Sequence, residues 1–501
     1  MLAEAGSPFW SPDSKSLAFL SSTGLQRVDL AGGASWTVCD FPNLLGTGAW
    51  TADGQILLGS DGGLFRVPAS GGTPSLLTVV DHSQGERGHV WPQAFPRGRF
   101  LYLAMSDRPE NAGIYAASLA RPAERVHLLT TDSNALYAPG GDGKDYLLWR
   151  RVGVLVAQEF DAAALKMRGE PRAVAGPARA TTGNGMIAAV SRSGSLLFSA
   201  AAATPSLLSW FNREGKSLGT VGEPAEYMTL RLSPDGRRIA ASRSQPNGPR
   251  EIWILESSRG AAIRFAPVDI GGLSAWPADG GALVYSSPSR NLFRREVAGN
   301  GNAQRLTESP HTQLVNDWSR DGRFILYQEL VRGGGKNDLM VLKLGSDGKP
   351  VGSRPWLSTP DNESDGRFAP SAKPRWVAYM SNESRRFEIY IDSFPERRKK
   401  IRVSIDGGRF AQWRGDGREL FFVSADYKLM AVDVKLGADS VETSAPRELF
   451  ALPIVENGLS PYEAAPDGQR FLVRAAMQQS QPLTLIVNWP ALLKGPALHG
   501  T

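Results

Sequence analysis

A short turn sequence of the type Ser-Pro-Asp-Gly recurs along the chain and constrains its fold more than any other feature. Its clearest copy is Ser233–Gly236, inside the stretch Leu230–Phe265. Proline presets φ for the second turn position, aspartate bonds the neighbouring backbone, and glycine accepts the left-handed exit. Strand-like runs come after it at 239–242 and 252–255, with a weaker one at 262–265. The stretch therefore predicts four short antiparallel strands, which make one blade of a β-propeller.

The same turn mark returns along the whole chain at spacings of roughly 40–51 residues, the range of propeller repeats. Apolar strand-like runs come after the marks, as in Leu17–Phe19 and Ile325–Tyr327. The content of 54 Gly and 34 Pro, without a sustained helical stripe of apolar residues, also favours an all-β protein. The marks lie at 11–14, 51–54, 96–98, 141–143, 191–194, 233–236, 277–280, 319–322, 370–372, 414–417 and 465–468.

The length of 501 residues favours two domains, because single hydrophobic cores stop growing near about 250–300 residues. Thr220–Glu226 is the best seam, with five marks before it and six after it. We predict two tandem β-propellers of four-stranded antiparallel blades. The first, residues 1–222, should have five to six blades, and its five marks leave it one blade short of a six-bladed ring. The second, residues 223–501, should have six blades. Leu483–Trp489 is expected to be the third strand of the last blade, and Ser217–Val221 to supply its fourth.

The turn marks resemble the WD40-like (PD40) repeats of the TolB type. Further stretches are similar to the C-terminal propeller region of bacterial eukaryotic-type serine/threonine protein kinases. In that family a membrane helix joins a cytoplasmic kinase domain to this region, so the resemblance implies a sensor or binding role outside the cytoplasm, with a membrane-anchored kinase as one candidate partner. No kinase motif is present, and no phosphoryl-transfer role is carried over to any residue. The similar stretches are Pro8–Asp13, Pro109–Tyr115, Gly215–Glu223, Arg409–Arg418 and Leu483–Trp489.

Charge and cysteine content exclude several classes of function. The net charge of +6 is small and interspersed, so no nucleic-acid partner is expected. The single Cys39 excludes an intrachain disulfide, and no Cys/His cluster has zinc spacing. Neither a signal peptide nor an apolar run long enough for a membrane span is found. As a complete chain this predicts a soluble cytoplasmic protein, whereas the kinase resemblance implies a periplasmic or extracytoplasmic one, and the compartment stays open.

Several residue patterns suggest chemistry, and each has a plainer interpretation that we favour. Gly215–Gly219 matches the G-x-S-x-G nucleophile elbow around Ser217, but the residues after it resemble a strand and then another propeller, so a hairpin turn is predicted. Asp81, His82, Glu86 and His89 lack metal-ligand spacing and are expected to be satisfied within a loop, so no metal is predicted. The remaining candidates are two glycine-rich loops interpreted as hairpin tips and one basic run interpreted as a solvated connection: Gly299–Gly301, Gly333–Lys336 and Arg397–Lys400.

The leading hypothesis is a non-catalytic module that binds a protein, peptide or small ligand at a propeller face. No catalytic residue and no cofactor is predicted, and the binding residues are left open. The alternatives are a TolB-like envelope scaffold, and a propeller hydrolase or lyase with acids in its channel mouth. Three or more carboxylates or histidines converging in one channel would favour the enzyme, whereas an apolar or mixed channel would favour binding.

Overall fold

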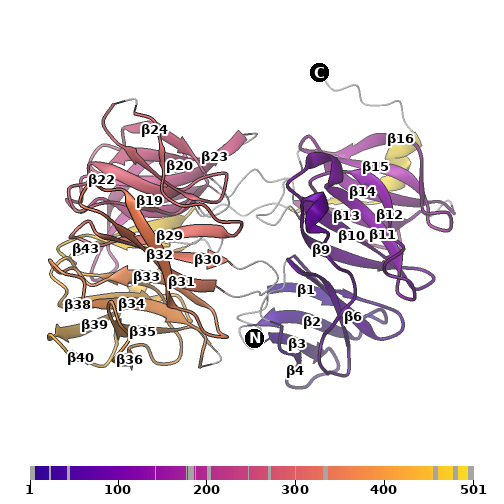
Figure 1. The fold of residues 1–501 in the computed structure, drawn as a ribbon. Coiled ribbons are helices and arrows are strands. Elements are labelled where there is room, and N and C mark those ends of the chain that lie inside the picture. Colours follow the sequence, from indigo (N-terminus) through magenta and orange to yellow (C-terminus); the bar gives the residue numbers. More distant parts are fainter. Residues whose placement is uncertain are drawn as a thin grey trace. The chain divides into compact units, whose positions relative to one another are not determined.

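The computed structural model consists almost wholly of short antiparallel strands (Figure 1). It describes the chain apart from residues 1–5, 22–23, 42–45, 141–142, 177, 179–184, 187, 200–204, 246–247, 269–271, 300, 331–336, 385, 455–460, 478–482 and 495–501. Helical structure in the described part is confined to short 3-10 turns, none of which has the length and hydrophobicity to cross a membrane. These turns are η1 (His82–Gln84), η2 (Pro109–Asn111) and η3 (Trp489–Lys494).

The chain divides into two compact units. Unit 1 comprises Met1–Ala202, Arg332–Gly335 and Ser480–Thr501, and unit 2 comprises Ala203–Val331 and Lys336–Gln479. Each unit is a succession of blades, and both are completed by strands that lie far away in the sequence.

Unit 1 holds five blades, each a small antiparallel sheet in the described residues, with the second and third joined by a single pairing between Ser60 and His89. The blades are, in order, β1 (Gly6–Trp10), β2 (Ser16–Ser21), β3 (Gly24–Asp29) and β4 (Trp36–Cys39); β5 (Ala49–Trp50), β6 (Gln55–Ser60), β7 (Gly63–Pro68) and β8 (Ser75–Leu76); β9 (Glu86–Phe95), β10 (Arg99–Ser106), β11 (Gly113–Ser118) and β12 (Val126–Thr130); β13 (Ala135–Pro139), β14 (Asp145–Arg151), β15 (Val154–Asp161) and β16 (Lys166–Ala175); and β17 (Ala188–Val190), β18 (Leu196–Ser199) and β44 (Leu483–Ile486).

Unit 2 holds six blades, and a hydrophobic cluster lies between each neighbouring pair, so that the ring is closed. The blades are β21 (Tyr227–Leu232), β22 (Arg238–Gln245), β23 (Gly248–Glu256) and β24 (Ala262–Pro267); β25 (Ser274–Ala275), β26 (Ala282–Ser286), β27 (Leu292–Glu296) and β28 (Gln304–Arg305); β29 (Thr312–Trp318), β30 (Phe324–Leu330), β31 (Asn337–Leu344) and β32 (Pro350–Leu357); β33 (Glu363–Phe368), β34 (Trp376–Ser381), β35 (Glu388–Ser393) and β36 (Lys400–Arg402); β37 (Arg409–Trp413), β38 (Glu419–Val423), β39 (Lys428–Leu436), β40 (Val441–Thr443) and β41 (Arg447–Ala451); and β42 (Tyr462–Ala464), β43 (Arg470–Ala476), β19 (Ser206–Asn212) and β20 (Ser217–Ala225).

The turn marks join the first and second strands of the blades, and their chemistry is local. Ser233 donates its hydroxyl proton to the Asp235 carboxylate at 2.6 Å, and that carboxylate also accepts the backbone N–H of Arg237 at 3.0 Å. Gly236 has φ +71°, the left-handed conformation that glycine adopts without strain. The prediction of an all-β protein with two tandem propellers is therefore confirmed, with five blades in the first and six in the second.

The predicted boundary between residues 222 and 223 is wrong, because the chain enters unit 2 earlier. Strand β19 pairs with β43, with Leu208 opposite Arg474, and β20 covers the outer edge of β19. Leu208, Trp210 and Val221 are buried in the cluster between the last and first blades of this ring. The seam at 220–226 therefore falls on strand β20 and its end, and the last blade borrows two strands rather than one.

The C-terminal assignment is also wrong, because Leu483–Trp489 does not belong to the second propeller. Strand β44 pairs with β18 in unit 1, where Leu485 lies opposite Leu197. Trp489 is fully buried there, with its ring centroid 5.4 Å from that of Tyr146. In Figure 1 the yellow end of the chain accordingly lies among the purple strands of unit 1. The outer face of this blade leaves Leu197, Leu485 and Val487 exposed, and among the described residues no hydrophobic cluster joins this blade to the first one.

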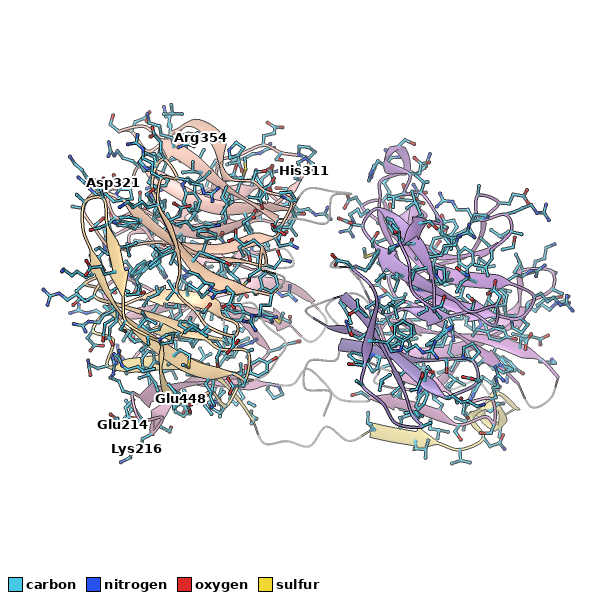
Figure 2. All side chains as sticks on the ribbon, turned by 90° about the horizontal axis from the view of Figure 1, so that it is seen from below. Glu214, Lys216, His311, Asp321, Arg354 and Glu448 are labelled. Atoms are coloured by element: carbon cyan, nitrogen blue, oxygen red, sulfur yellow. The ribbon has the colours of Figure 1, made fainter. Side chains whose placement is uncertain are left out.

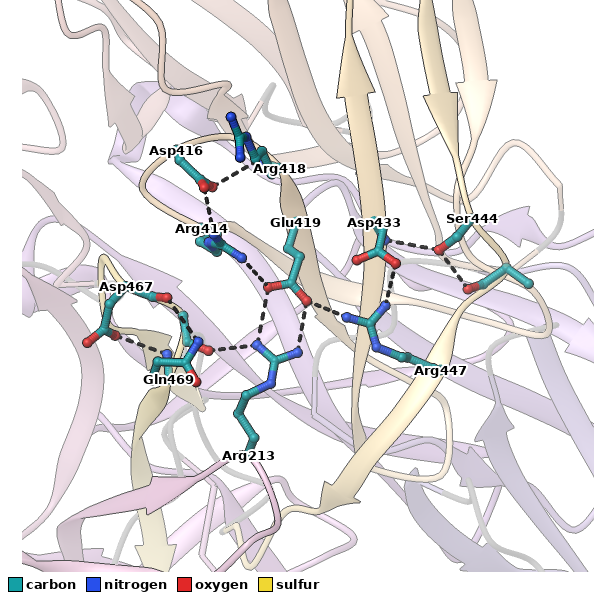
Figure 3. A network of polar contacts seen from close by, with 12 residues as sticks. Arg213, Arg414, Asp416, Arg418, Glu419, Asp433, Ser444, Arg447, Asp467 and Gln469 are labelled. Atoms are coloured by element: carbon teal, nitrogen blue, oxygen red, sulfur yellow. Dashed lines mark hydrogen bonds and ion pairs between the residues drawn. The ribbon is translucent and has the colours of Figure 1, made fainter.

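A carboxylate between three arginines ties the borrowed hairpin of unit 2 to its ring (Figure 3). Glu419 on β38 is 5% exposed and accepts hydrogen bonds from Arg213 at 2.8 and 3.2 Å, from Arg414 at 3.1 Å, and from Arg447. Arg213 sits on the turn between β19 and β20, and it also donates to the carbonyl of Gly468 at 2.8 Å. The network therefore links the fifth blade, the borrowed strands and the turn between β42 and β43.

Candidate functional site

A funnel of 440 Å³ opens at the centre of unit 2, at the end where the turn marks lie. The innermost strand of each blade and the turn after it contribute to its wall. The lining is mixed, with tryptophan and proline side chains on the wall and charged side chains at the floor. The lining residues are Arg231, Leu232, Ser233, Pro234, Trp276, Ala278, Asp317, Trp318, Arg320, Arg367, Phe368, Ala369, Pro370, Gln412, Trp413, Gly415, Glu463, Ala464 and Pro466.

Three tryptophans give the funnel a rigid wall. The indole N–H of Trp276 donates to the carbonyl of Arg231 at 3.1 Å. That of Trp318 donates to the carbonyl of Gly322 at 3.1 Å, and that of Trp413 to the carbonyl of Arg367 at 3.2 Å. Because each N–H is engaged by backbone, the rings present apolar surface to a ligand.

The floor on one side is built around Arg231 and Glu463. Their closest atoms, Nη1 and Oε1, lie 3.3 Å apart, and both side chains are less than one-tenth exposed. Glu463 also accepts the amide N–H of Gln412 at 3.0 Å and the backbone N–H of Leu232 at 3.1 Å. Since Glu463 belongs to the last blade and Leu232 to the first, this carboxylate also helps to close the ring.

The other side of the floor is built around Arg367, Asp365 and Asp317. Arg367 pairs with Asp365 at 2.8 Å and donates to the carbonyl of Asn316. Asp317 accepts the backbone N–H of Trp318 at 2.9 Å and that of Phe368 at 2.8 Å. The second contact joins neighbouring blades, as the Glu463 contact does.

The electrostatics of the floor are those of a buried, nearly balanced set of charges. Burial raises the pKa of Asp317, Asp365 and Glu463, and the two neighbouring arginines partly offset the rise. Burial also lowers the pKa of Arg231. Two carboxylates, Asp317 and Glu463, thus line the channel, and Asp365 pairs with the lining residue Arg367. Each of the three is engaged by an arginine or by backbone N–H groups. No group of three or more metal-ligating side chains suited to an ion is found among the described residues.

The structure places Ser217 at the start of β20, directly after the turn that joins β19 and β20. Lys216 beside it lies at the tip of this hairpin (Figure 2). A nucleophile elbow requires a strand before the serine and a helix after it. Since a strand comes after Ser217, the hairpin turn predicted from the sequence matches the structure.

Glu86 and His89, two of the residues considered as metal ligands, lie together in unit 1 and form a network of hydrogen bonds. Their side chains lie 3.1 Å apart, and His89 shares a 2.7 Å hydrogen bond with the hydroxyl of Thr78. Arg125 pairs with Glu86 at 2.7 Å. Burial lowers the pKa of His89, although Glu86 opposes the shift. Thr78 and Arg125 complete this network from distant parts of the sequence. No sequence pattern indicates that either residue would contact His89 or Glu86.

Asp81 and His82, the other two residues of that predicted loop, contribute through or near the backbone. The backbone N–H of Asp81 donates to Glu86 at 2.8 Å, and its carboxylate caps η1 by accepting the N–H of Ser83. The imidazole of His82 lies 3.1 Å from the carbonyl oxygen of Glu86. Both histidines are therefore satisfied by their surroundings, as predicted. The prediction of a single loop is wrong, because Glu86 and His89 lie on strand β9 and His82 lies in η1.

The basic run Arg397–Lys400 is largely neutralised by neighbouring carboxylates. Arg397 pairs with Asp392 at 2.9 Å, Arg398 with Glu396, and Lys400 with Glu383 at 2.6 Å. This agrees with a solvated connection more than with a surface for phosphate backbones. The two glycine-rich loops include positions outside the described residues, namely residue 300 and residues 333–336.

Comparison with known proteins gives similarity of fold. No protein-family model matches the chain, and no curated protein matches its sequence. A putative TolB from Agrobacterium tumefaciens is 16% identical with a TM-score of 0.42, covering 55% of this chain and 99% of its own. TolB from Acinetobacter baumannii is 10% identical with a TM-score of 0.35, covering 78% of this chain and 80% of its own. The tricorn protease is 10% identical with a TM-score of 0.34, covering 96% of this chain and 62% of its own.

The chain is similar in structure to TolB-like and tricorn-like β-propellers. The comparisons do not show an association with a kinase.

One buried acid in unit 2 supplies a pH-dependent prediction. Burial raises the pKa of Glu363 to about 7, although a hydrogen bond from the Thr359 hydroxyl opposes the rise. An acid whose folded pKa exceeds its unfolded value makes the fold less stable as pH rises between the two values. We expect Glu363→Gln to stabilise unit 2 by about 1–3 kcal/mol at pH 8 and by little at pH 4. Denaturant unfolding at both pH values measures this, and equal effects at the two would contradict it.

Proposed function

We propose that the chain is a non-catalytic binding module whose second propeller receives a peptide segment or a loop of a partner protein in the central funnel. The observation that supports this most is the state of the floor. Asp317, Asp365 and Glu463 are held by arginines or by backbone N–H groups, and two of them also join neighbouring blades. Side chains used in this way stabilise the ring, and a general base would have to give up these contacts to act.

The chemistry of the funnel favours an extended peptide over a compact polar metabolite. Tryptophan and proline side chains line the opening, and the guanidinium groups of Arg231, Arg320 and Arg367 lie at the rim and floor. Such walls accept apolar side chains, while the exposed guanidinium group of Arg320 donates to carbonyl or carboxylate oxygens. The volume of 440 Å³ accommodates a few side chains of a partner.

The narrower proposal is that this module is the sensor or interaction region of a receptor-type serine/threonine kinase. The sequence stretches similar to the propeller region of those kinases support it. An envelope scaffold of the TolB type is the alternative within the same class. Co-purification with a kinase encoded beside this chain would favour the sensor role.

Blocking the funnel is expected to abolish binding without unfolding the ring. Ala278 lies exposed on the funnel wall, within the turn 277–280. Peptides selected from a displayed random library on the full chain should bind Ala278→Trp at least about tenfold more weakly. Ala52→Trp is the matched control, because Ala52 holds the same position of the turn 51–54 in unit 1 and is also exposed.

Two outcomes would contradict this proposal. If the selected peptides bind Ala278→Trp as well as they bind the original chain, the funnel is not the binding site. If mass spectrometry finds the peptides cleaved after incubation, and the cleavage is lost in Glu463→Gln, the channel is an active site. Recovery of intact peptide from the complex is the expected result.

A further inference from the structure

A second cavity, of 650 Å³, lies at the periphery of unit 2. It is formed by the start of β30, the turn before β34, the connection after β35 and the turn after β39. Its volume is within the range of sites that bind small ligands or a few peptide residues. None of the residues that line it also lines the central funnel.

The bottom of this groove is aromatic and rigid. The rings of Phe324 and Phe394 meet edge to face, with their centroids 5.1 Å apart. Trp376 is 3% exposed, and its indole N–H donates to the carbonyl of Gly437 at 3.0 Å. Pro374 and Pro395 also line the cavity. The bottom therefore offers ordered apolar contacts, with its one indole N–H already engaged.

The rim of the groove carries an excess of positive charge. The acidic lining residues are Glu396 and Asp439, and the basic ones are Arg323, Lys373, Arg375, Arg398 and Lys399. Arg323 pairs with Asp321 at 2.9 Å, and Arg398 pairs with Glu396. Within the described part of the chain, no carboxylate pairs with Lys373, Arg375 or Lys399.

Backbone hydrogen bonds hold part of this rim in position. The hydroxyl of Ser393 accepts the backbone N–H groups of Arg398 at 2.7 Å and Lys399 at 3.1 Å, and it donates to the carbonyl of Glu396 at 2.8 Å. The carbonyl of Arg375 accepts the N–H of Phe394 at 2.7 Å. Cations on a fixed backbone lose less conformational entropy when they bind an anion.

We propose that this groove binds an acidic peptide segment that carries one bulky apolar side chain. The apolar side chain would rest on the Phe324–Phe394–Trp376 surface, and carboxylates on either side of it would meet Lys373, Arg375 and Lys399. Charge complementarity identifies the occupant, since the unpaired cations surround an apolar centre. This site does not depend on the function proposed for the funnel.

The probe is a fluorescein-labelled, acetylated and amidated pentapeptide in which one phenylalanine stands between two acidic residues on each side. Its affinity for the full chain should fall several-fold between about 50 and about 300 mM salt. Lys373→Glu with Arg375→Glu should weaken it at least about tenfold. The control, Lys216→Glu with Arg259→Glu, makes the same charge change elsewhere on unit 2 and should leave the affinity within about twofold.

Three further measurements decide between outcomes. Replacing the acids of the probe by their amides, or its phenylalanine by alanine, should each weaken binding at least about tenfold. Ala278→Trp in the funnel should have no effect, so that this proposal and the proposed function can fail separately. Equal losses in the test and control variants, equal affinity for the amide probe, displacement by an oligonucleotide of equal charge, or no binding at about 1 mM probe would each overturn the proposal.

Discussion

A fragment of residues 203–479 is expected to fold as a complete six-bladed propeller, whereas a fragment of residues 223–501 is expected to be largely unfolded. The cut at 223 removes β19 and most of β20. Leu208, Trp210 and Val221 leave the cluster that joins the last blade to the first. Deleting a single buried residue of this size costs about 2–5 kcal/mol, and an uncovered blade exposes both its edge and its face.

Guanidinium unfolding monitored by tryptophan fluorescence measures the difference. The 203–479 fragment should unfold in one cooperative transition, and the 223–501 fragment should show no transition or one at a far lower denaturant concentration. Equal midpoints for the two fragments would contradict the assignment of β19 and β20 to the second ring.

Glu419→Ala is expected to destabilise unit 2 by about 2–3 kcal/mol, because it leaves the half-buried Arg213, Arg414 and Arg447 facing one another without their shared carboxylate. Glu448→Ala is the matched control. Glu448 lies on the surface of the same unit (Figure 2) and pairs with Lys428 at 2.9 Å, so its loss should cost at most about 1 kcal/mol. Equal effects of the two variants would show that the Glu419 network does not hold the borrowed hairpin.

The Glu419 effect should also depend on pH. Although burial raises the pKa of Glu419, hydrogen bonds from Arg213 and Arg414 outweigh it and hold the pKa below its usual range. A depressed pKa gives stability that is fully present above the unfolded value near about 4.5 and is lost as pH falls through the folded value. The difference between the original chain and Glu419→Ala should therefore be largest near neutral pH and shrink in acid.

The blades could be predicted from the sequence because the turn between their first two strands has its own local chemistry. Ser233, Asp235 and Gly236 satisfy one another within the turn, so the motif forms the same turn wherever it occurs. The third and fourth strands have no comparable mark. The sequence of Leu483–Ile486 is typical of a third strand in any blade. Its pairing with β18 depends on which blade has no third strand of its own, and this is known only when the whole ring is assembled.

The floor of the funnel was missed, although a signal for it exists. Arg231, Asp317, Gln412 and Glu463 each stand two residues before the first residue of a turn mark, and side chains alternate along a strand with a period of two. Arg367 stands three residues before its mark, after a register shift in β33. A polar residue repeated at this position of otherwise apolar strands predicts a polar channel. The pairing of Glu463 with Arg231 could not be predicted, because the two are brought together only when the last blade meets the first.

The most direct test of the two-propeller account is a cross-link between β18 and β44. Leu197 and Leu485 lie directly opposite each other, and both are exposed. Opposite residues of antiparallel strands have Cα atoms about 4.5–5.5 Å apart, a span that a disulfide bridges. Cys39 should not interfere, since it is buried and burial raises the pKa of its thiol to about 11.

Leu197→Cys with Leu485→Cys should therefore form an intrachain disulfide under mild oxidation and raise the stability of unit 1. Ala475→Cys with Leu485→Cys is the contrasting pair, because Ala475 on β43 lies opposite Leu207 in unit 2. The pairing of β44 with β18 predicts much faster cross-linking of the first pair than of the second. Cross-linking of the second pair without the first would place the C-terminal strand in the second propeller and contradict the assignment of β44 to unit 1.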